Sequence, residues 1–261
     1  MNGMLRSEFA KDLTGKACCG FPIIERWSLS ILSKLCTADK SMIPTVADKD
    51  FFESLIKRAP EKDVKCIFRG KCNGHRFLQL IRFLTSCVTT EGACRAFIDA
   101  GGVPWLKMVY CESTVKKPYS PTLISHIAAL VANVLSFGAM VLPTWTMSQG
   151  SSIYTIVALL NYNKNMLVQK DTARAVSYMM PYYVERRTVV FGKGFFKAFL
   201  KIIDCDFNEY PVKDALELQL YTLRSMVLIG LGCKKTITFL FNYPHLFIYI
   251  YFFISDRQQD I

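Results

Sequence analysis

Apolar residues recur every three to four positions along most of the chain, which is the period of an α-helix. This spacing predicts helices over residues 22–36, 48–58, 74–88, 89–100, 102–112, 121–137, 150–161, 165–180, 193–203 and 211–229. No segment shows the two-residue alternation that predicts a half-buried strand. We therefore expect an all-α fold.

The predicted helices recur in pairs, a shorter helix followed by a longer and more apolar one. Aligning Phe52, Val103, Ile153 and Phe196 in the shorter helices gives steps of 51, 50 and 43 residues. A unit of about 45 residues with two or three helices is typical of armadillo and HEAT solenoids. The pattern predicts a right-handed α-solenoid of helical repeats.

One corner between two helices is marked clearly in the sequence. Ala100, Gly101 and Gly102 follow an amphipathic stretch, and Pro104 stands near the start of the next one. Glycine just past a helix end and proline in a first turn are typical of a tight connection. Similar corners are expected near Gly150 and Gly194.

Two stretches resemble the armadillo repeat family. Residues 100–106 read AGGVPWL, and residues 153–179 contain IVALL, then VQ, and alanines at helical spacing. The resemblance implies a third helix in each repeat, whose asparagine grips the backbone of an extended peptide. That position is Asn133 in one repeat but Ser86, Tyr178 and Ser225 in others. One asparagine does not make a ladder, so the resemblance does not extend to a nuclear-localisation-type peptide.

The domain organisation follows from where the repeat pattern holds. We predict an N-terminal extension over residues 1–21, an armadillo-like domain over 22–232, and a hydrophobic tail or atypical cap over 233–261. Residues 236–254 are uncharged and aromatic-rich, so a membrane anchor is an alternative. Residues 124–145 are also uncharged, but a glycine and a proline shorten them to a buried helix. Arg257 to Asp260 is similar to a stretch of SERAC-like lipid-remodelling proteins, which suggests a truncated serine hydrolase as a further alternative.

Charge and cysteine usage bear on partner and compartment. The net charge is +11, with 32 basic and 21 acidic residues. An acidic protein partner, a nucleic acid or an anionic membrane surface could exploit this excess. No run of five basic residues occurs, so the pattern favours a solvated basic surface spread over many helices, and nucleic acid is not the expected partner. The ten cysteines are scattered among apolar neighbours, and the N-terminus lacks the apolar stretch of a signal peptide. Reduced cysteines in a cytoplasmic protein are expected.

Motifs for catalysis, metal ions and cofactors are missing from the sequence. The chain has no H-E-x-x-H, C-x-x-C, phosphate-binding glycine loop or G-x-S-x-G element. His126 lies in an apolar helix, where we expect a hydrogen-bonded core residue. The expectation is therefore a non-enzymatic protein without cofactor or metal.

The candidate binding residues lie on or near the third helices. Asn133, Arg174 and Tyr178 are expected on the inner face of the solenoid, and Tyr182, Arg186 and Arg187 form a basic and aromatic cluster. Trp27, Trp105 and Trp145 are either binding anchors or core residues. The sequence thus predicts a protein-interaction scaffold whose partner it does not identify.

Overall fold

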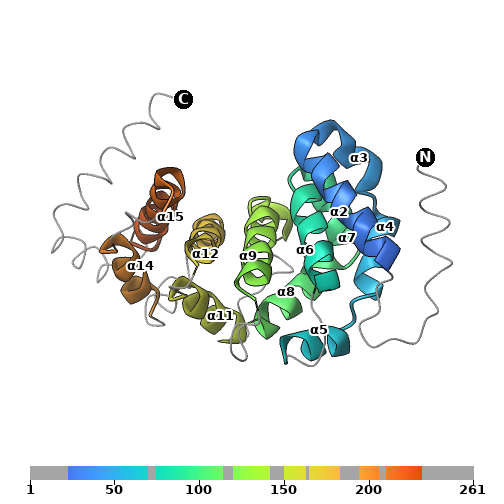
Figure 1. Ribbon diagram of the computed structural model, residues 1–261. Helices are drawn as coiled ribbons and strands as arrows, with labels where there is room; N and C mark the ends of the chain where they lie inside the picture. The colour runs from blue at the N-terminus through green and yellow to red at the C-terminus, as the bar shows by residue number, and fades with distance from the viewer. Residues whose placement is uncertain are drawn as a thin grey trace. The chain divides into compact units, whose positions relative to one another are not determined.

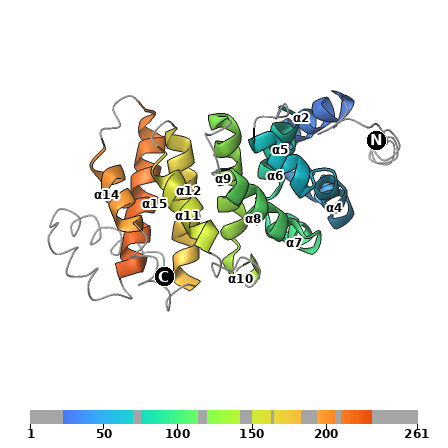
Figure 2. The same cartoon turned by 90° about the horizontal axis from the view of Figure 1, so that it is seen from below.

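The computed structural model describes residues 23–69, 75–113, 120–141, 150–162, 165–182, 194–205 and 210–230. Every regular element in these ranges is a helix, which confirms the all-α prediction. The helices fall into two compact units, α2 to α10 and α11 to α15, shown from two directions in Figures 1 and 2. The predicted N-terminal extension, residues 1–21, and the predicted C-terminal tail, residues 233–261, lie outside the described residues.

The first unit contains α2 (Ile23–Ala38), η1 (Lys40–Met42), α3 (Ile43–Val46), α4 (Lys49–Lys57), α5 (Glu61–Phe68), α6 (His75–Cys87), α7 (Glu91–Asp99), α8 (Gly102–Glu112), α9 (Pro121–Leu135) and α10 (Gly138–Val141). Its helices repeat in triplets, because α4, α5 and α6 pack against α7, α8 and α9 in turn. The long helices α6 and α9 lie side by side in Figure 1, and α2 packs against the other flank of α6. Helix α2 therefore takes the place of a preceding third helix.

Two core contacts fix the register between the triplets. The rings of Phe52 on α4 and Phe97 on α7 meet edge to face, with their centroids 5.7 Å apart. The indole nitrogen of Trp105 on α8 donates a hydrogen bond of 2.8 Å to the carbonyl oxygen of Ala59, just before α5. Trp105 is buried, so this residue belongs to the core.

The predicted alignment of Phe52 with Val103 is wrong. Phe52 lies in the first helix of its repeat and faces Phe97, whereas Val103 lies in a second helix, whose counterpart is α5. The sequence pattern missed α5 because this helix is short and its apolar residues occupy one narrow face. Pro60 precedes it, Glu61 and Asp63 occupy its first turn, and Val64, Ile67 and Phe68 are buried. An acidic first turn after proline is a helix-start signal.

The second unit contains α11 (Gly150–Leu160), α12 (Met166–Met179), η2 (Met180–Tyr182), α14 (Phe195–Ile203) and α15 (Val212–Gly230). Helix α11 packs against α12 and α14, and α15 packs against α12 and α14. Figure 1 shows the pair α12 and α15 above the pair α11 and α14. The second and third helices of successive repeats are thus paired here as in the first unit.

The predicted glycine corner is confirmed in both units. Gly101 before α8 has φ of 76°, and Gly194 before α14 has φ of 88°. Both values lie in the left-handed region, which glycine enters without the steric cost of a Cβ atom. The next residue, Gly102, is needed for space, because a Cβ atom there would lie 2.5 Å from the ring of Phe97.

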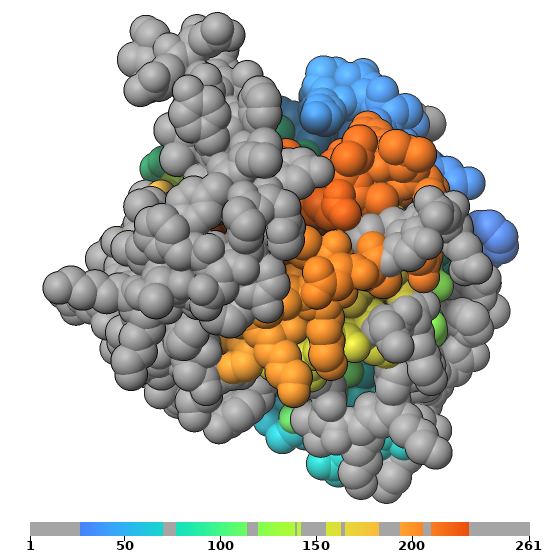
Figure 3. Space-filling model, turned by 90° about the vertical axis from the view of Figure 1, so that its left-hand side faces the viewer, coloured from blue at the N-terminus to red at the C-terminus, as the bar shows by residue number. Residues whose placement is uncertain are grey.

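The first and last described helices each expose a row of apolar side chains. On α2 the row is Trp27, Ile31 and Leu35, which are 60%, 56% and 45% exposed. On α15, which faces the viewer in Figure 3, Val212, Leu216 and Leu220 are also exposed. Residues four apart lie on one face of a helix, so each row is a continuous stripe.

Candidate functional site

The candidate site is built on the third helices, because the armadillo pattern places its ligand-gripping position there. That position is Ser86 on α6, Asn133 on α9, Tyr178 on α12 and Ser225 on α15. Within each unit, polar side chains join one third helix to the next, and we call each such line of contacts a seam. The first unit has an α6–α9 seam, and the second has an α12–α15 seam.

In the α6–α9 seam, Asn133 ties two helices together. Its Nδ2 donates a hydrogen bond of 3.0 Å to the carbonyl oxygen of Thr85. The hydroxyl of Thr85 in turn donates to the carbonyl oxygens of Ile81, at 2.7 Å, and His126, at 3.2 Å. Asn133 therefore uses part of its amide for a contact inside the protein.

His126 completes this seam. The Nε of Arg82 donates a hydrogen bond of 3.1 Å to Nε2 of His126, which requires an imidazole with an unprotonated Nε2. Burial lowers the pKa of His126, and the positive charge of Arg82 lowers it further. The expectation of a hydrogen-bonded histidine is confirmed, although the side chain is only half-buried.

The flank of α6 that faces α2 is joined by small hydroxyl and thiol groups. The hydroxyls of Ser33 and Ser86 lie 2.8 Å apart, and Thr37 donates to Ser86 at 3.3 Å. On the same two helices, the thiols of Cys36 and Cys87 are buried, and their sulfur atoms lie 3.6 Å apart. The hydrogen bond from Cys87 lowers the pKa of Cys36, whereas the same contact and burial raise the pKa of Cys87.

Reduced cysteines were predicted, and the described thiols agree with this only in part. Cys36, Cys87 and Cys94 are free and buried. Burial raises the pKa of Cys94 to about 12, so it is inert as a nucleophile at neutral pH. Cys66 differs, because its sulfur is in a disulfide bond. The prediction is wrong at that position.

The α12–α15 seam is held by charged groups. The ammonium group of Lys170 on α12 lies 2.5 Å from a carboxylate oxygen of Asp214 and 3.1 Å from one of Glu217, both on α15. Burial lowers the pKa of Lys170, but these hydrogen bonds outweigh it and leave the pKa raised. Lys170 therefore stays charged as the centre of a partly buried ion-pair cluster.

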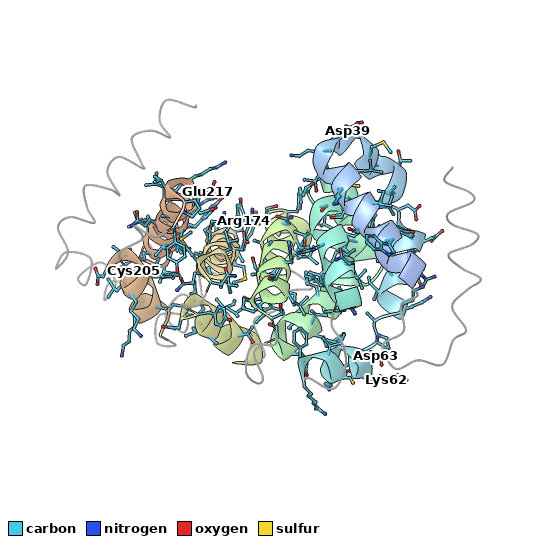
Figure 4. All side chains as sticks on the ribbon, in the orientation of Figure 1. Asp39, Lys62, Asp63, Arg174, Cys205 and Glu217 are labelled. Carbon is cyan, nitrogen blue, oxygen red and sulfur yellow. The ribbon has the colours of Figure 1, made fainter. Side chains whose placement is uncertain are left out.

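Arg174, a predicted site residue, lies one turn after Lys170 on α12. Figure 4 labels it together with Glu217 on the neighbouring helix. Its guanidinium lies 3.1 Å from the carboxylate of Asp171, which is buried. Burial raises the pKa of Asp171, while Arg174 and Lys170 oppose that rise.

Tyr178, a second predicted site residue, continues the same row on α12. Its ring lies 6.4 Å from the ring of Tyr221 on α15, and the guanidinium of Arg224 stands 5.7 Å from its centroid. Burial raises the pKa of Tyr221, and Tyr178 raises it further. Sequence analysis missed Tyr221 and Arg224, although Tyr221 lies four residues before Ser225 and three before Arg224, and residues three or four apart are neighbours on a helix surface.

The structure brings only some of the predicted residues together. Arg174 and Tyr178 share one face of α12, and Tyr182 is exposed in η2 directly after this helix. Asn133 belongs to the first unit. Arg186 and Arg187 lie outside the described residues, as does Trp145.

Two further predictions concern metal ions and membranes. Among the residues that the structure describes, no group of three histidine, cysteine or acidic side chains is arranged to hold a metal ion. None of the described helices has the length and apolar character required to cross a bilayer. Helix α9, which covers part of the uncharged stretch 124–145, ends at Leu135. The possible anchor at 236–254 lies in the part of the chain that is not described.

Comparison with known proteins shows the fold. An engineered protein of known crystal structure is similar to this chain with a TM-score of 0.64 and 16% identity, over 90% of this chain and 85% of the other. A computationally designed armadillo repeat protein for modular peptide recognition gives a TM-score of 0.57 and 13% identity, over 92% and 87%. A designed armadillo repeat protein in complex with the peptide (KR)4 gives 0.52 and 14%, over 84% and 82%.

No protein-family model matches the chain, and no curated protein matches its sequence. The structural similarities confirm the predicted fold class, an all-α solenoid of armadillo-like repeats. They also confirm the sequence resemblance at the level of the fold.

Proposed function

We propose that this chain is a non-enzymatic interaction module that binds an extended segment of a protein partner along its third helices. The observation that carries the proposal is the α12–α15 seam, where charged and aromatic side chains stand half-buried in a row. Aromatic and arginine side chains supply most of the energy in protein interfaces. Designed armadillo repeat proteins for peptide recognition share the fold.

The chemistry of the seam supports binding rather than catalysis. Lys170, Arg174, Asp171, Asp214 and Glu217 are engaged with one another in ion pairs. Burial raises the pKa of the Tyr221 hydroxyl, so this group is a poorer acid than an ordinary tyrosine, and its ring faces the ring of Tyr178. Such groups are suited to contact a polypeptide through rings and hydrogen bonds.

The proposed contact residues are Arg174 and Tyr178 on α12, with Tyr221 and Arg224 opposite them on α15. Tyr182 extends this set beyond the end of α12. Asn133, Arg186 and Arg187 remain predicted contacts. Because the chain carries a net charge of +11, we propose that the partner segment is acidic and is attracted at long range.

Fluorescence anisotropy with two labelled octapeptides tests the proposal. The acidic peptide (DE)4 should bind the full chain more tightly than (KR)4, and added salt should weaken its binding. Tyr178→Ala or Arg224→Ala should weaken it about tenfold, as expected for an interface residue of about 1.4 kcal/mol.

Arg95→Ala is the matched control, because Arg95 is an exposed arginine on α7 whose ion pair is with Glu91 in its own helix. It removes the same charge and should leave the affinity unchanged. If neither peptide binds, or if Arg224→Ala binds (DE)4 as tightly as Arg95→Ala does, the proposed site is wrong.

A further inference from the structure

Two buried thiols face each other between α2 and α6, away from the proposed binding residues. The sulfur atoms of Cys36 and Cys87 lie 3.6 Å apart, and both side chains are free thiols. These cysteines are 51 residues apart in the sequence and meet because α2 packs along α6 (Figure 1). The fold therefore creates a pair of thiols that the scattered cysteines of the sequence do not reveal.

The two sulfur atoms are close enough to form a bond after a small movement. A disulfide has an S–S length of about 2.05 Å, so the sulfur atoms must approach each other by about 1.5 Å from their separation of 3.6 Å. Among the described helices, α2 packs mainly against α6, and it exposes Trp27, Ile31 and Leu35 on its surface. A slight shift of α2 toward α6 therefore disturbs little other packing.

The surroundings of the two thiols differ in their exposure to solvent. Cys36 lies in the last turn of α2, where Leu35 and Thr37 on either side of it are exposed. Cys87 is the last residue of α6 and is followed by Val88, which is buried. Because helix ends open more readily than helix centres, a small oxidant reaches Cys36 when the last turn of α2 opens locally.

The two thiols also differ in acidity. The hydrogen bond from Cys87 lowers the pKa of Cys36, whereas the same contact and burial raise the pKa of Cys87. The thiolate is the form of cysteine that attacks an oxidant. Exposure and acidity therefore both favour Cys36 as the first thiol to react, with Cys87 as the neighbouring thiol that completes a disulfide.

We propose that Cys36 and Cys87 are an oxidisable thiol pair, which hydrogen peroxide converts into a disulfide bond between α2 and α6. The thiolate of Cys36 attacks one peroxide oxygen, the O–O bond breaks, and the other oxygen leaves as water after taking up the thiol proton. Cys36 is then a sulfenic acid. The sulfur of Cys87 attacks the sulfur of Cys36, the S–O bond breaks, and the hydroxyl group leaves as a second water with the proton of Cys87. The two thiols give two electrons to one peroxide.

The disulfide bond holds the first described helix on its neighbour. It closes a loop between residues that are 51 positions apart, which reduces the conformational freedom of the unfolded chain. Cys87 directly follows Ser86, the position on α6 that corresponds to the ligand-gripping asparagine of the armadillo pattern. Oxidation therefore stiffens the α2 flank of this third helix, and this inference is independent of the proposed α12–α15 binding site.

Peptide mapping of the full chain tests the bond directly. The chain is treated with hydrogen peroxide, the remaining thiols are alkylated under denaturing conditions, and tryptic peptides are analysed by mass spectrometry. Peptides 35–40 and 83–95 should be joined through Cys36 and Cys87. Peptide 83–95 also contains Cys94, which is buried and free, and this thiol should carry the alkyl group.

Three alanine variants test the role of each thiol. Cys87→Ala should stop the reaction at the sulfenic acid of Cys36, which dimedone captures. Cys36→Ala should leave Cys87 as a thiol that dimedone does not label. Cys94→Ala is the matched control, because it removes an equally buried thiol next to the pair in sequence, and it should leave the yield of the joined peptides unchanged.

Thermal unfolding provides a second measurement. Peroxide should raise the Tm of the parent chain and of Cys94→Ala by about 5–10 °C, as expected for a disulfide that closes a loop of this length. Cys36→Ala and Cys87→Ala should show no such rise. The Cys66 disulfide is common to all four chains, so it does not contribute to the difference.

The proposal is overturned if peroxide leaves peptides 35–40 and 83–95 of the parent chain unjoined, or if the link runs through Cys94. It is also overturned if Cys36→Ala gains as much in Tm as the parent chain. Dimedone labelling of Cys87 in Cys36→Ala, as strong as that of Cys36 in Cys87→Ala, would contradict the assignment of Cys36 as the attacking thiol.

Discussion

The two seams join equivalent helices with different chemistry. In the α6–α9 seam, Asn133, Thr85 and His126 form hydrogen bonds in which most groups are uncharged. In the α12–α15 seam, Lys170 holds two carboxylates of the next helix. The paired residues Arg82 and His126 are 44 positions apart, as are Lys170 and Asp214. The repeat length therefore determines which positions of adjacent third helices face each other. The side chains at these positions determine how the helix contact depends on salt and pH.

This difference indicates where a ligand can act. Hydrogen bonds to backbone carbonyls are local and are hardly affected by salt, so the α6–α9 seam suits a fixed helix contact. A half-buried charged side chain can leave its ion-pair partner within the protein and pair with a charged group of a ligand instead. The free energy cost of this exchange is modest, because the side chain is paired both before and after the ligand binds. The comparison thus favours the second unit as the responsive one.

The strongest test of the comparison is the removal of the charge at the centre of the α12–α15 seam. Lys170→Met keeps most of the side-chain length but leaves Asp214, Glu217 and the buried Asp171 without this cation. We expect the free energy of unfolding to fall by about 2 kcal/mol, between the values for exposed and buried ion pairs. Urea unfolding followed by circular dichroism measures the change.

Lys57→Met provides the control for this variant. Lys57 pairs with Glu53 in α4, and its side chain is 72% exposed. The loss should stay below about 0.5 kcal/mol. Equal losses for the two variants would show that the α12–α15 seam contributes no more than an ordinary surface pair.

Removing the amide that joins α6 and α9 should have a smaller effect. Asn133→Ala leaves the half-buried carbonyl of Thr85 without this donor, which should cost about 1 kcal/mol. Asn161→Ala removes a hydrogen bond of 2.8 Å to Val157 at an exposed end of α11, so water replaces the lost donor. A cost for Asn133→Ala no larger than that for Asn161→Ala would contradict the role of Asn133 as a tie.

The smallest expected effect is an opposite response of the two seams to pH. The pKa of folded His126 lies below its ordinary value of 6.5, so between these values only the unfolded chain binds the proton, and stability falls as the pH is lowered through 6.5. The pKa of folded Asp171 lies above its ordinary value of 3.8, so the folded chain binds the proton first, and stability rises as the pH is lowered toward 3.8.

Matched variants isolate these two contributions from the other titrating groups. His126→Gln retains an acceptor for Arg82 but does not titrate, and Asp171→Asn keeps the shape of the carboxyl group. The free energy of unfolding of each variant and of the parent chain is measured at several pH values. Below pH 6.5 the parent chain should lose stability relative to His126→Gln. As the pH approaches 3.8, the parent chain should gain stability relative to Asp171→Asn. Parallel curves for both variants would refute the assignment.

Much of the fold follows from the sequence, because helix periodicity and corner residues are local signals. The helices 102–112 and 121–137 were predicted within two residues of α8 and α9. Helix α5 was not predicted, because eight residues with three buried apolar side chains give too short a periodic pattern. Its omission displaced the alignment of the first repeat, since Phe52 then had no correct counterpart.

The candidate site was less accessible to sequence reasoning. Asn133, Arg174 and Tyr178 were identified from their positions in the repeat. Their partners were not, because a bond to the carbonyl of Thr85 or a ring contact with Tyr221 depends on how two helices pack side by side. A charge at Lys170 and another at Asp214 become a pair only when a third helix of the next repeat lies beside the first.

The left-handed glycines at Gly101 and Gly194 have a consequence for how such repeats can diverge in sequence. Any other residue there adopts a backbone conformation that costs roughly 1 kcal/mol, whereas the helix faces tolerate many apolar exchanges. Under selection for stability, the helix sequences should therefore diverge between repeats sooner than the glycines at the corners do. A search for related chains is best anchored on these glycines, with the intervening helices treated only as patterns of polar and apolar positions.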